Sequence, residues 1–358
     1  MRQKLLLTGM FVLFVLSCSA QNTLPIVKAS SLKANFRDGT RIDKNGWRIS
    51  PKTNPDIHLT SANQVTFITD LDSITFKIKP GKPCNFIVLL NNKDTAYTQI
   101  KYVPSHLDIL KKAAKYNYAD KREILKYTYL SPDNPELIAI RTKFKLDSIA
   151  GTGNEISRII NLLHWVHNTY PHNGNIAVPG YNSTLELMIV TKNEHKTLEC
   201  GTLAMVLNEC YSALGFKSRQ VICLPKDSTD VDCHSINTVY SKTLNKWLWI
   251  DPTNDAYVMN EQGELLSIAE VRERLINGKT LIVNPDANWN HQVSKTKEDY
   301  LNEYMAKNLY ALLCYVVTDG ENKSNLLLPL DYKGIIPRTA ASKPKCTNNP
   351  DTFWVIPE

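Results

Sequence analysis

The chain has 358 residues, of which 43% are hydrophobic and 22% charged. This length and balance predict a globular protein with room for two domains and exclude a disordered chain. The formal net charge of +7 falls to +5 once Arg2 and Lys4 are set aside as part of a leader, and the remaining basic residues are scattered among acidic ones. No nucleic-acid partner is therefore expected.

The N-terminus has the pattern of an export signal. Basic residues precede an apolar run from Leu5 to Leu16, which is too short to span a bilayer comfortably, so residues 1–17 are predicted to be a signal peptide. The run Val15-Leu16-Ser17-Cys18 looks like a bacterial lipobox, in which Cys18 becomes the first mature residue and carries lipid. The alternative is an ordinary cleavage site before Gln21. We expect an exported protein that is lipid-anchored at the cell envelope, with membrane contact only through Cys18, or otherwise a secreted or periplasmic soluble one.

The first domain, residues 18–104, is predicted to be a small β-sandwich. Residues 21–55 are polar and turn-rich, with hairpin signals at Asp38-Gly39 and Asn45-Gly46. Strand patterns follow at Ser73–Lys79, Phe86–Leu90 and Thr95–Tyr102. A glycan or a protein would be the ligand of such a domain.

From Ser105 onward the apolar spacing becomes helical, which marks a second domain over residues 105–358 with its core at 135–260. Helices are predicted near Leu107–Ala114 and over Pro135–Ala150, Glu155–Tyr170, Ile268–Gly278 and Tyr300–Cys314. The fold class is therefore α+β. His164 and His167 flank the apolar stripe of their helix, and their spacing does not match two metal ligands, so we interpret them as ordinary surface or packing residues.

Cys200 falls at the first turn of a predicted helix that ends at Gly215. The positive end of the helix dipole and the unpaired N–H groups there favour a thiolate, which makes Cys200 a candidate nucleophile. Taken alone, a cysteine on an apolar face is more often an inert core residue.

A base for this thiol is found in the hairpin that follows. The strands His234–Tyr240 and Lys246–Asp251 are predicted to flank a loop of Ser241–Leu244, with Tyr240 opposite Asn245. Counting outward places His234 directly opposite Asp251 on one face, close enough for a carboxylate to orient the imidazole. Asp251 would orient His234, His234 would accept the proton of Cys200, and the thiolate would form an acyl-enzyme. Each residue also has a plain interpretation, since a lone histidine often only hydrogen-bonds and Asp251 before Pro252 suits a turn.

These blocks closely resemble the transglutaminase-like superfamily over about Pro135–Tyr257. The resemblance rests on Cys200 opening a helix that ends in Leu214-Gly215, on His234–Tyr240, and on Trp249-Ile250-Asp251-Pro252-Thr253. It implies a papain-like fold with a Cys-His-Asp triad. Leu198 and Ile236 depart from the family pattern, in which a glycine often lies two residues before the cysteine and an aromatic residue two after the histidine. The backbone N–H of Cys200 is the expected oxyanion donor, and the second donor is not identified.

The predicted function is acyl transfer on amide or peptide bonds through a Cys200 thioester, with a protein or peptide as substrate. Hydrolysis is favoured over amine cross-linking, because an exported enzyme must exclude abundant water to favour amines. The alternative is a non-catalytic surface-binding protein with a degenerate scaffold of this kind.

No cofactor or metal is expected. The carboxylates lack the spacing of a calcium-binding loop, and no Cys-x-x-Cys pair supports a zinc site built from Cys210, Cys223, Cys233 and His234. Cys223 and Cys233 flank the loop before His234, and a disulfide between them is a further hypothesis.

Overall fold

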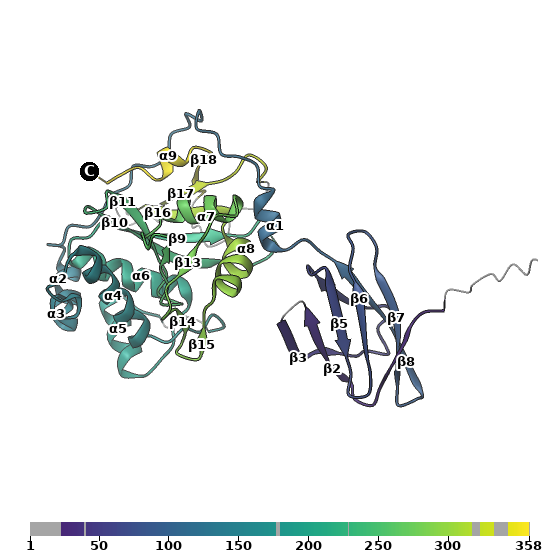
Figure 1. Ribbon diagram of the computed structural model, residues 1–358. Coiled ribbons are helices and arrows are strands. Elements are labelled where there is room, and N and C mark those ends of the chain that lie inside the picture. The colour runs from purple at the N-terminus through teal and green to yellow at the C-terminus, as the bar shows by residue number, and fades with distance from the viewer. Residues whose placement is uncertain are drawn as a thin grey trace, which may run out of the picture. The chain divides into compact units, whose positions relative to one another are not determined.

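The computed structural model describes residues 23–38, 41–176, 180–227, 229–316, 323–332 and 343–357. The chain divides into two compact units, Met1–Val103 and Pro104–Glu358 (Figure 1). The predicted signal peptide and Cys18 lie outside the described residues, so the lipid anchor stays a prediction. Within the described ranges, no helix has both the length and the apolar character needed to cross a membrane.

The first unit is a β-sandwich of two four-stranded sheets. One sheet has the order β1 (Ile26–Ala29), β7 (Cys84–Leu90), β8 (Asp94–Tyr102) and β4 (Asp56–Thr60), and the other has the order β3 (Arg41–Arg48), β2 (Lys33–Asp38), β5 (Gln64–Ile68) and β6 (Ser73–Lys77). Alternate residues of both sheets are buried in one shared core, including Phe36, Trp47, Phe67 and Phe86. This is the pattern that two sheets packed face to face require.

The segment that was predicted to be turn-rich contains three of these strands. Asp38 pairs with Arg41 across the end of the β2–β3 hairpin, as the signal at Asp38 indicated. The second hairpin signal is wrong, because Asn45 and Gly46 lie inside β3, where Asn45 has a positive φ of 55° and the register shifts. A bulge uses the same left-handed conformation as a tight turn, so the sequence signal is shared by both.

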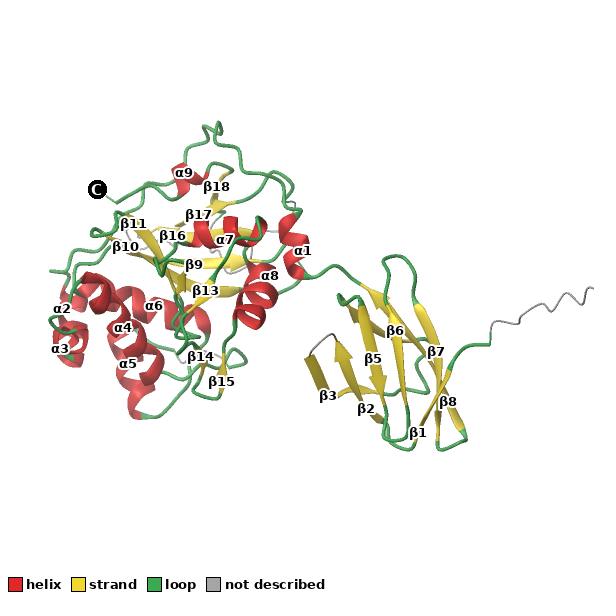
Figure 2. Cartoon of the chain, in the orientation of Figure 1, coloured by secondary structure: helices red, strands yellow, loops and turns green. Residues whose placement is uncertain are grey.

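The second unit is built on a six-stranded sheet with helices on both faces (Figure 2). The strand order is β11 (Lys246–Ile250), β10 (His234–Ser241), β9 (Ser218–Leu224), β16 (Ala311–Val316), β17 (Lys323–Leu327) and β18 (Lys345–Thr347). One face packs against α2 (Pro135–Phe144), α3 (Leu146–Ala150), α4 (Glu155–Thr169), α5 (Thr184–Asn193) and α6 (Cys200–Ala213). The other packs against α1 (His106–Lys111), α7 (Ile268–Ile276), the π-helix η1 (Lys297–Met305), α8 (Ala306–Asn308) and α9 (Pro350–Phe353). Short pairs β12 (Val258–Met259) with β13 (Ile282–Val283), and β14 (Asn288–Trp289) with β15 (Val293–Ser294), complete it.

Strand β11 shows how the sequence assigns the two faces. Leu248 and Ile250 are buried against α4 and α6, while Trp249 between them is buried against α7 and η1. The four positions after Lys246 are all apolar because both faces of the sheet are covered. The α+β class predicted from the sequence is confirmed.

Two predicted helices differ from the structure. The helix over 135–150 is broken at Lys145, which has a left-handed φ of 55°, into α2 and α3. The helix over 300–314 is wrong in its second half, because residues 311–316 form β16 in the middle of the sheet. A short run that is apolar on all sides, such as Leu312-Leu313-Cys314, fits a buried strand and a buried helix equally well.

Candidate active site

Cys200 is the first residue of α6, and Glu199 is its N-cap. The Glu199 carboxylate accepts hydrogen bonds from the backbone N–H of Gly201 at 2.7 Å and of Thr202 at 2.6 Å. The sequence analysis predicted unpaired N–H groups at this helix end that would favour a thiolate. That prediction is wrong for Gly201 and Thr202, whose N–H groups are both bonded. The carboxylate offsets the positive end of the helix, so any activation of the thiol must come mainly from other groups.

Two side-chain amides from the sheet fix the first turn of α6. Gln220 on β9 donates from Nε2 to the Gly201 carbonyl at 2.9 Å, and Asn237 on β10 donates from Nδ2 to the Ala204 carbonyl at 2.8 Å. Since β10 also begins with His234, the same strand holds both the helix of the nucleophile and the candidate base.

The register of the β10–β11 hairpin differs from the prediction by two residues. Tyr240 lies opposite Trp247, where Asn245 was expected, because the loop begins one residue later than predicted. The direct opposition of His234 and Asp251 is therefore wrong. A shift by two residues preserves the alternation of side chains, so the two groups still lie on one face. The His234 Nε2 and Asp251 Oδ2 atoms are 2.8 Å apart.

The turn itself explains the shift. Asn245 adopts a left-handed φ of 52° and closes the loop, and its side chain accepts a hydrogen bond from the Tyr240 hydroxyl at 2.6 Å. Asparagine tolerates this conformation better than most residues. The Glu155 carboxylate also accepts hydrogen bonds from the loop N–H groups of Lys242 and Thr243.

Asp251 is fully buried and is held by donors on several sides. Its carboxylate accepts hydrogen bonds from the Tyr300 hydroxyl at 2.6 Å, from Asn254 Nδ2 at 2.9 Å and from the Thr253 N–H at 2.9 Å. A buried carboxylate needs such partners, because leaving it unpaired would cost several kcal/mol, of the order of 3–5. The turn that follows β11 is thus built around this one side chain.

The π-helix η1 supports the His–Asp pair. Tyr300 donates to Asp251 and accepts a hydrogen bond from the indole N–H of Trp249 at 3.1 Å. Tyr304, one turn later, packs edge-on against the His234 ring with centroids 5.2 Å apart. π-helical segments are rare and occur often at functional sites.

The charges of the three predicted residues reinforce one another. Burial acts to raise the pKa of Cys200, but hydrogen bonds from the His172 and His234 side chains outweigh it and lower that pKa to about 6. Burial acts to lower the pKa of His234, and the charge of Asp251 outweighs it and raises that pKa. Burial acts to raise the pKa of Asp251, and the charge of His234 lowers it instead. Near neutral pH the groups therefore form a thiolate–imidazolium–carboxylate chain.

His172 is a site residue that the sequence analysis missed. It lies in the segment after α4 and forms a parallel β-bridge with Leu198, two residues before Cys200. Its side chain is near enough to the Cys200 thiol to lower the pKa of that thiol, while the Cys200 Sγ atom itself lies 3.8 Å from Glu199 Oε2. The sequence carried no signal for it, because an isolated histidine after a helix has no motif around it.

The two histidines that the sequence did single out lie elsewhere. The His167 ring is buried and hydrogen-bonds the Pro252 carbonyl at 3.0 Å, and His164 pairs with Asp255 at 2.7 Å. Both therefore hold the turn that follows Asp251. The packing role predicted for them agrees with these contacts.

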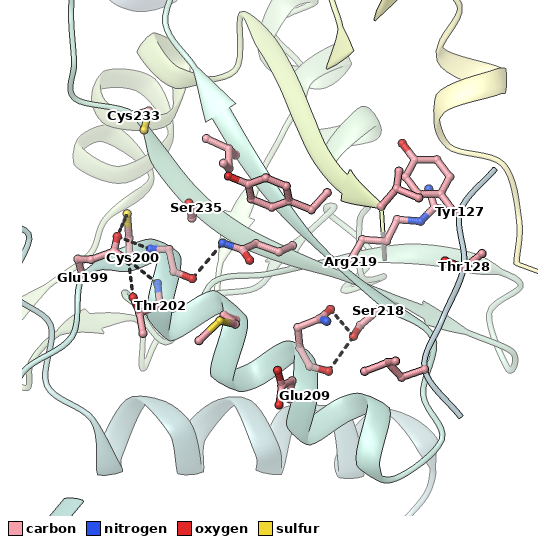
Figure 3. A pocket seen from close by; sticks show the side chains of 18 of the residues that line it. Tyr127, Thr128, Glu199, Cys200, Thr202, Glu209, Ser218, Arg219, Cys233 and Ser235 are labelled. Carbon is pink, nitrogen blue, oxygen red and sulfur yellow. Dashed lines mark hydrogen bonds between the residues drawn. The ribbon is translucent and has the colours of Figure 1, made fainter. Parts of the chain in front are cut away.

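A cleft of about 700 Å³ begins at Cys200 and Glu199 and runs along α6 toward Arg219 and Tyr127 (Figure 3). The Arg219 side chain is buried in its wall and donates hydrogen bonds to the carbonyls of Phe353 at 3.0 Å and Val355 at 2.8 Å. This volume is within the range of about 300–1,000 Å³ that is typical of ligand-binding clefts.

The strand register bears on the disulfide that was predicted between Cys223 and Cys233. Cys223 lies opposite His234, and Cys223 and Cys233 are both free thiols, so the proposed disulfide is wrong. A hairpin places neighbouring residues on opposite faces, which points Cys233 away from its expected partner. No group of three or more His, Cys, Asp or Glu side chains in the described ranges could hold a metal ion.

No protein-family model matches the chain, and no curated protein matches it. Among the solved structures that are similar to part of the chain are the following three. A proposed cysteine protease from Cytophaga hutchinsonii is 16% identical with a TM-score of 0.27, and the match covers 36% of this chain and 40% of that one. Legionella pneumophila LapG is 12% identical with a TM-score of 0.27, covering 48% and 92%. Red sea bream transglutaminase is 10% identical with a TM-score of 0.27, covering 69% and 52%. Likeness at this level carries no argument on activity.

Proposed function

We propose that this protein is a cysteine-dependent acyl-transfer enzyme that acts on amide or peptide bonds of a protein or peptide. One observation carries the proposal. The pKa of the Cys200 thiol at the start of α6 is lowered by the His234 side chain, whose Nε2 atom is 2.8 Å from the buried carboxylate of Asp251. A nucleophile, a base and a group that orients the base are the three parts that this chemistry needs.

The first half of the reaction would proceed from the thiolate–imidazolium pair. The Cys200 sulfur bonds to the substrate carbonyl carbon, and the carbonyl π electrons move to oxygen. When they return, the C–N bond breaks, and the His234 imidazolium gives its proton to the leaving amine. A thioester on Cys200 and a neutral His234 remain, with Asp251 fixing the imidazole orientation throughout.

In the second half we favour water as the acceptor. Neutral His234 takes a proton from water, the hydroxyl oxygen bonds to the thioester carbon, and the C–S bond breaks to give a carboxylic acid and the thiolate pair. Cys200 is partly exposed at one end of the cleft, which supports access of water to the thioester. An amine acceptor would need water to be kept away from this position.

The test supplies both acceptors at once. The purified chain is incubated with a protein substrate such as casein and a fluorescent primary amine, and both new peptide termini and amine incorporation are measured, with Cys200→Ser as the matched inactive control. We expect new termini without incorporation in the wild type and neither in Cys200→Ser. Dominant incorporation would make the enzyme an amine transferase. A wild type that does neither, and whose Cys200 reacts with iodoacetamide no faster than an ordinary thiol, would overturn the proposal.

We also propose that the enzyme is exported and tethered by lipid on Cys18. This rests on the sequence of the leader alone. Membrane fractionation of the wild type and of Cys18→Ala, expressed from the full sequence in a bacterial host, tests it. An unchanged membrane-bound fraction in Cys18→Ala would contradict the anchor.

A further inference from the structure

The His172 backbone is fixed next to the nucleophile from two sides. Leu198 donates to the Pro171 carbonyl at 2.9 Å and accepts from the Asn173 N–H at 2.8 Å, which ties the segment to the residues just before Cys200. On its other side, the Asn290 side chain accepts from the His172 N–H at 2.7 Å and donates to the His172 carbonyl at 2.8 Å. This two-sided clamp leaves the segment little freedom.

The His172 ring is oriented by the Trp289 indole N–H, which can bond only the tautomer whose Nδ1 carries no hydrogen. The Trp289 indole N–H points at His172 Nδ1 from 3.0 Å, with the two rings edge-on at a centroid distance of 6.3 Å. An indole N–H only donates, so Nδ1 must be the acceptor. While this bond is made, the ring carries its hydrogen on Nε2, and Nε2–H is the donor that the ring can offer to the neighbouring Cys200 sulfur, whose pKa the His172 side chain lowers.

The first turn of α6 offers few donors for the charge that the reaction creates, and the backbone N–H of Ser235 on β10 also helps to lower the pKa of the Cys200 thiol. Attack on a carbonyl moves the negative charge from sulfur to the substrate oxygen, and acyl-transfer enzymes stabilise that oxygen with fixed N–H groups. The N–H groups of Gly201 and Thr202 already bond the Glu199 carboxylate. In the first turn of α6, this leaves the Cys200 N–H as the available backbone donor among the described residues.

We propose that His172 is a catalytic residue whose Nε2–H is the second donor to the oxyanion, and that Trp289 is a positioning residue which keeps the hydrogen on that nitrogen. The inference rests on the proposed function and identifies the second oxyanion donor, which that function requires but does not name. In the resting enzyme the Nε2–H bonds the thiolate. As the S–C bond forms and the C–O π bond breaks, the same N–H turns to the oxygen on the adjacent carbon, and no proton leaves His172 in the step.

The experiment compares two reactions of Cys200 in the full chain. Acetylation by p-nitrophenyl acetate passes through an oxyanion, whereas alkylation by iodoacetamide displaces iodide at a saturated carbon and does not. Both are followed at the Cys200 peptide by mass spectrometry at one pH. Because both start from the same thiolate, the ratio of the two rates cancels any change in the thiolate fraction.

Three variants at position 172 separate the roles. His172→Gln places an amide N–H at about the reach of Nε2, His172→Asn places it only at about the reach of Nδ1, and His172→Ala has none. We expect the acetylation-to-alkylation ratio to fall about 100-fold in His172→Ala and His172→Asn, and to return to within about tenfold of the wild type in His172→Gln. His195→Asn is the matched control, because His195 is exposed and has a positive φ of 52° that asparagine tolerates.

Other results would overturn the inference. A ratio that changes by less than about threefold in His172→Ala means that His172 only supports the thiolate. If Cys200 of the wild type is alkylated fast but its acetylation-to-alkylation ratio is no higher than that of glutathione, the site does not stabilise an oxyanion. That result would contradict the role of His172 and leave the thiolate–imidazolium pair of the proposed function intact. A wild type that is not alkylated fast removes the proposed function and this inference with it.

Trp289→Phe tests the positioning role separately. Loss of the indole N–H allows the hydrogen of the His172 ring to sit on either nitrogen, so the ratio should fall by less than in His172→Ala. In the background of His172→Gln, which needs no choice of nitrogen, Trp289→Phe should have no further effect on the ratio. An equal loss in both backgrounds would mean that Trp289 acts only through packing.

Discussion

The pH profile of Cys200 alkylation in His234→Ala gives the sharpest test of the charge arrangement. In the wild type, bonds from His172 and His234 hold the pKa of Cys200 at about 6, against an ordinary value of 9.0. Without the imidazolium, burial acts with less opposition, and the pKa should return to about 9. The thiolate would then be scarce at acidic and neutral pH.

The magnitude follows from two opposing effects. At pH 5.5 the thiolate fraction is about 0.24 for a pKa of about 6 and about 0.0003 for a pKa of about 9, a ratio of roughly 800. A thiolate whose pKa is lower by about three units is also intrinsically less nucleophilic, by about 20-fold at a Brønsted coefficient of about 0.45. The wild type should therefore react about 30- to 40-fold faster at pH 5.5, and the variant about tenfold faster at pH 9. The two curves should cross between about pH 7 and pH 8.

The assay measures the rate of iodoacetamide addition to the Cys200 peptide from pH 5 to pH 10, with thermal unfolding of each variant as a check on folding. Asp251→Asn, which keeps the imidazole, should shift the profile in the same direction by less. Parallel curves that never cross, or a wild-type midpoint near about 8.5, would refute the reasoning, because either result means that His234 does not stabilise the thiolate.

Two further predictions concern stability. Tyr300→Phe removes a donor to Asp251 and leaves the buried Trp249 N–H without its acceptor. The free energy of unfolding, measured by urea titration, should therefore fall by about 1–3 kcal/mol. A loss under about 0.5 kcal/mol would contradict these hydrogen bonds. The hydrogen bond with Asp255 raises the pKa of His164 above 6.5, so the pair stabilises the fold fully below pH 6.5 and loses this contribution as the pH rises through the raised value. The wild type should therefore exceed His164→Gln in stability by more at pH 5.5 than at pH 9, and a flat or opposite trend would count against the pair.

The residues predicted to do the chemistry were those with local sequence signals. Cys200 opens a helix whose stop signal at Gly215 is readable, and Gly215 has the expected left-handed φ of 80°. His234 and Asp251 belong to one hairpin, where alternation alone places them on a common face. The exact register could not be read, because it depends on which residue of the loop takes the left-handed conformation, and Asn245 is one of several candidates there.

The residues that hold these groups were not predictable in the same way. His172, Trp289 and Tyr300 come from segments far apart in the chain, and each is placed by a tertiary hydrogen bond. The sequence around Tyr300 correctly indicated a helix, but its π-helical form and its bond to Asp251 depend on packing against the sheet. Propensity and periodicity describe local structure and carry no information on such partners.

The different roles that we propose for the two histidines beside Cys200 follow from the partners of their other nitrogens. His234 Nε2 faces the acceptor Asp251, which stabilises the charged ring and lets the opposite nitrogen exchange a proton with the thiol. His172 Nδ1 faces the donor Trp289, which keeps that nitrogen free of a proton and makes the opposite one a donor. A carboxylate behind one ring and an indole behind the other therefore prevent the two imidazoles from competing for the Cys200 proton. In the proposed reaction, His234 would therefore move protons and His172 would stabilise negative charge.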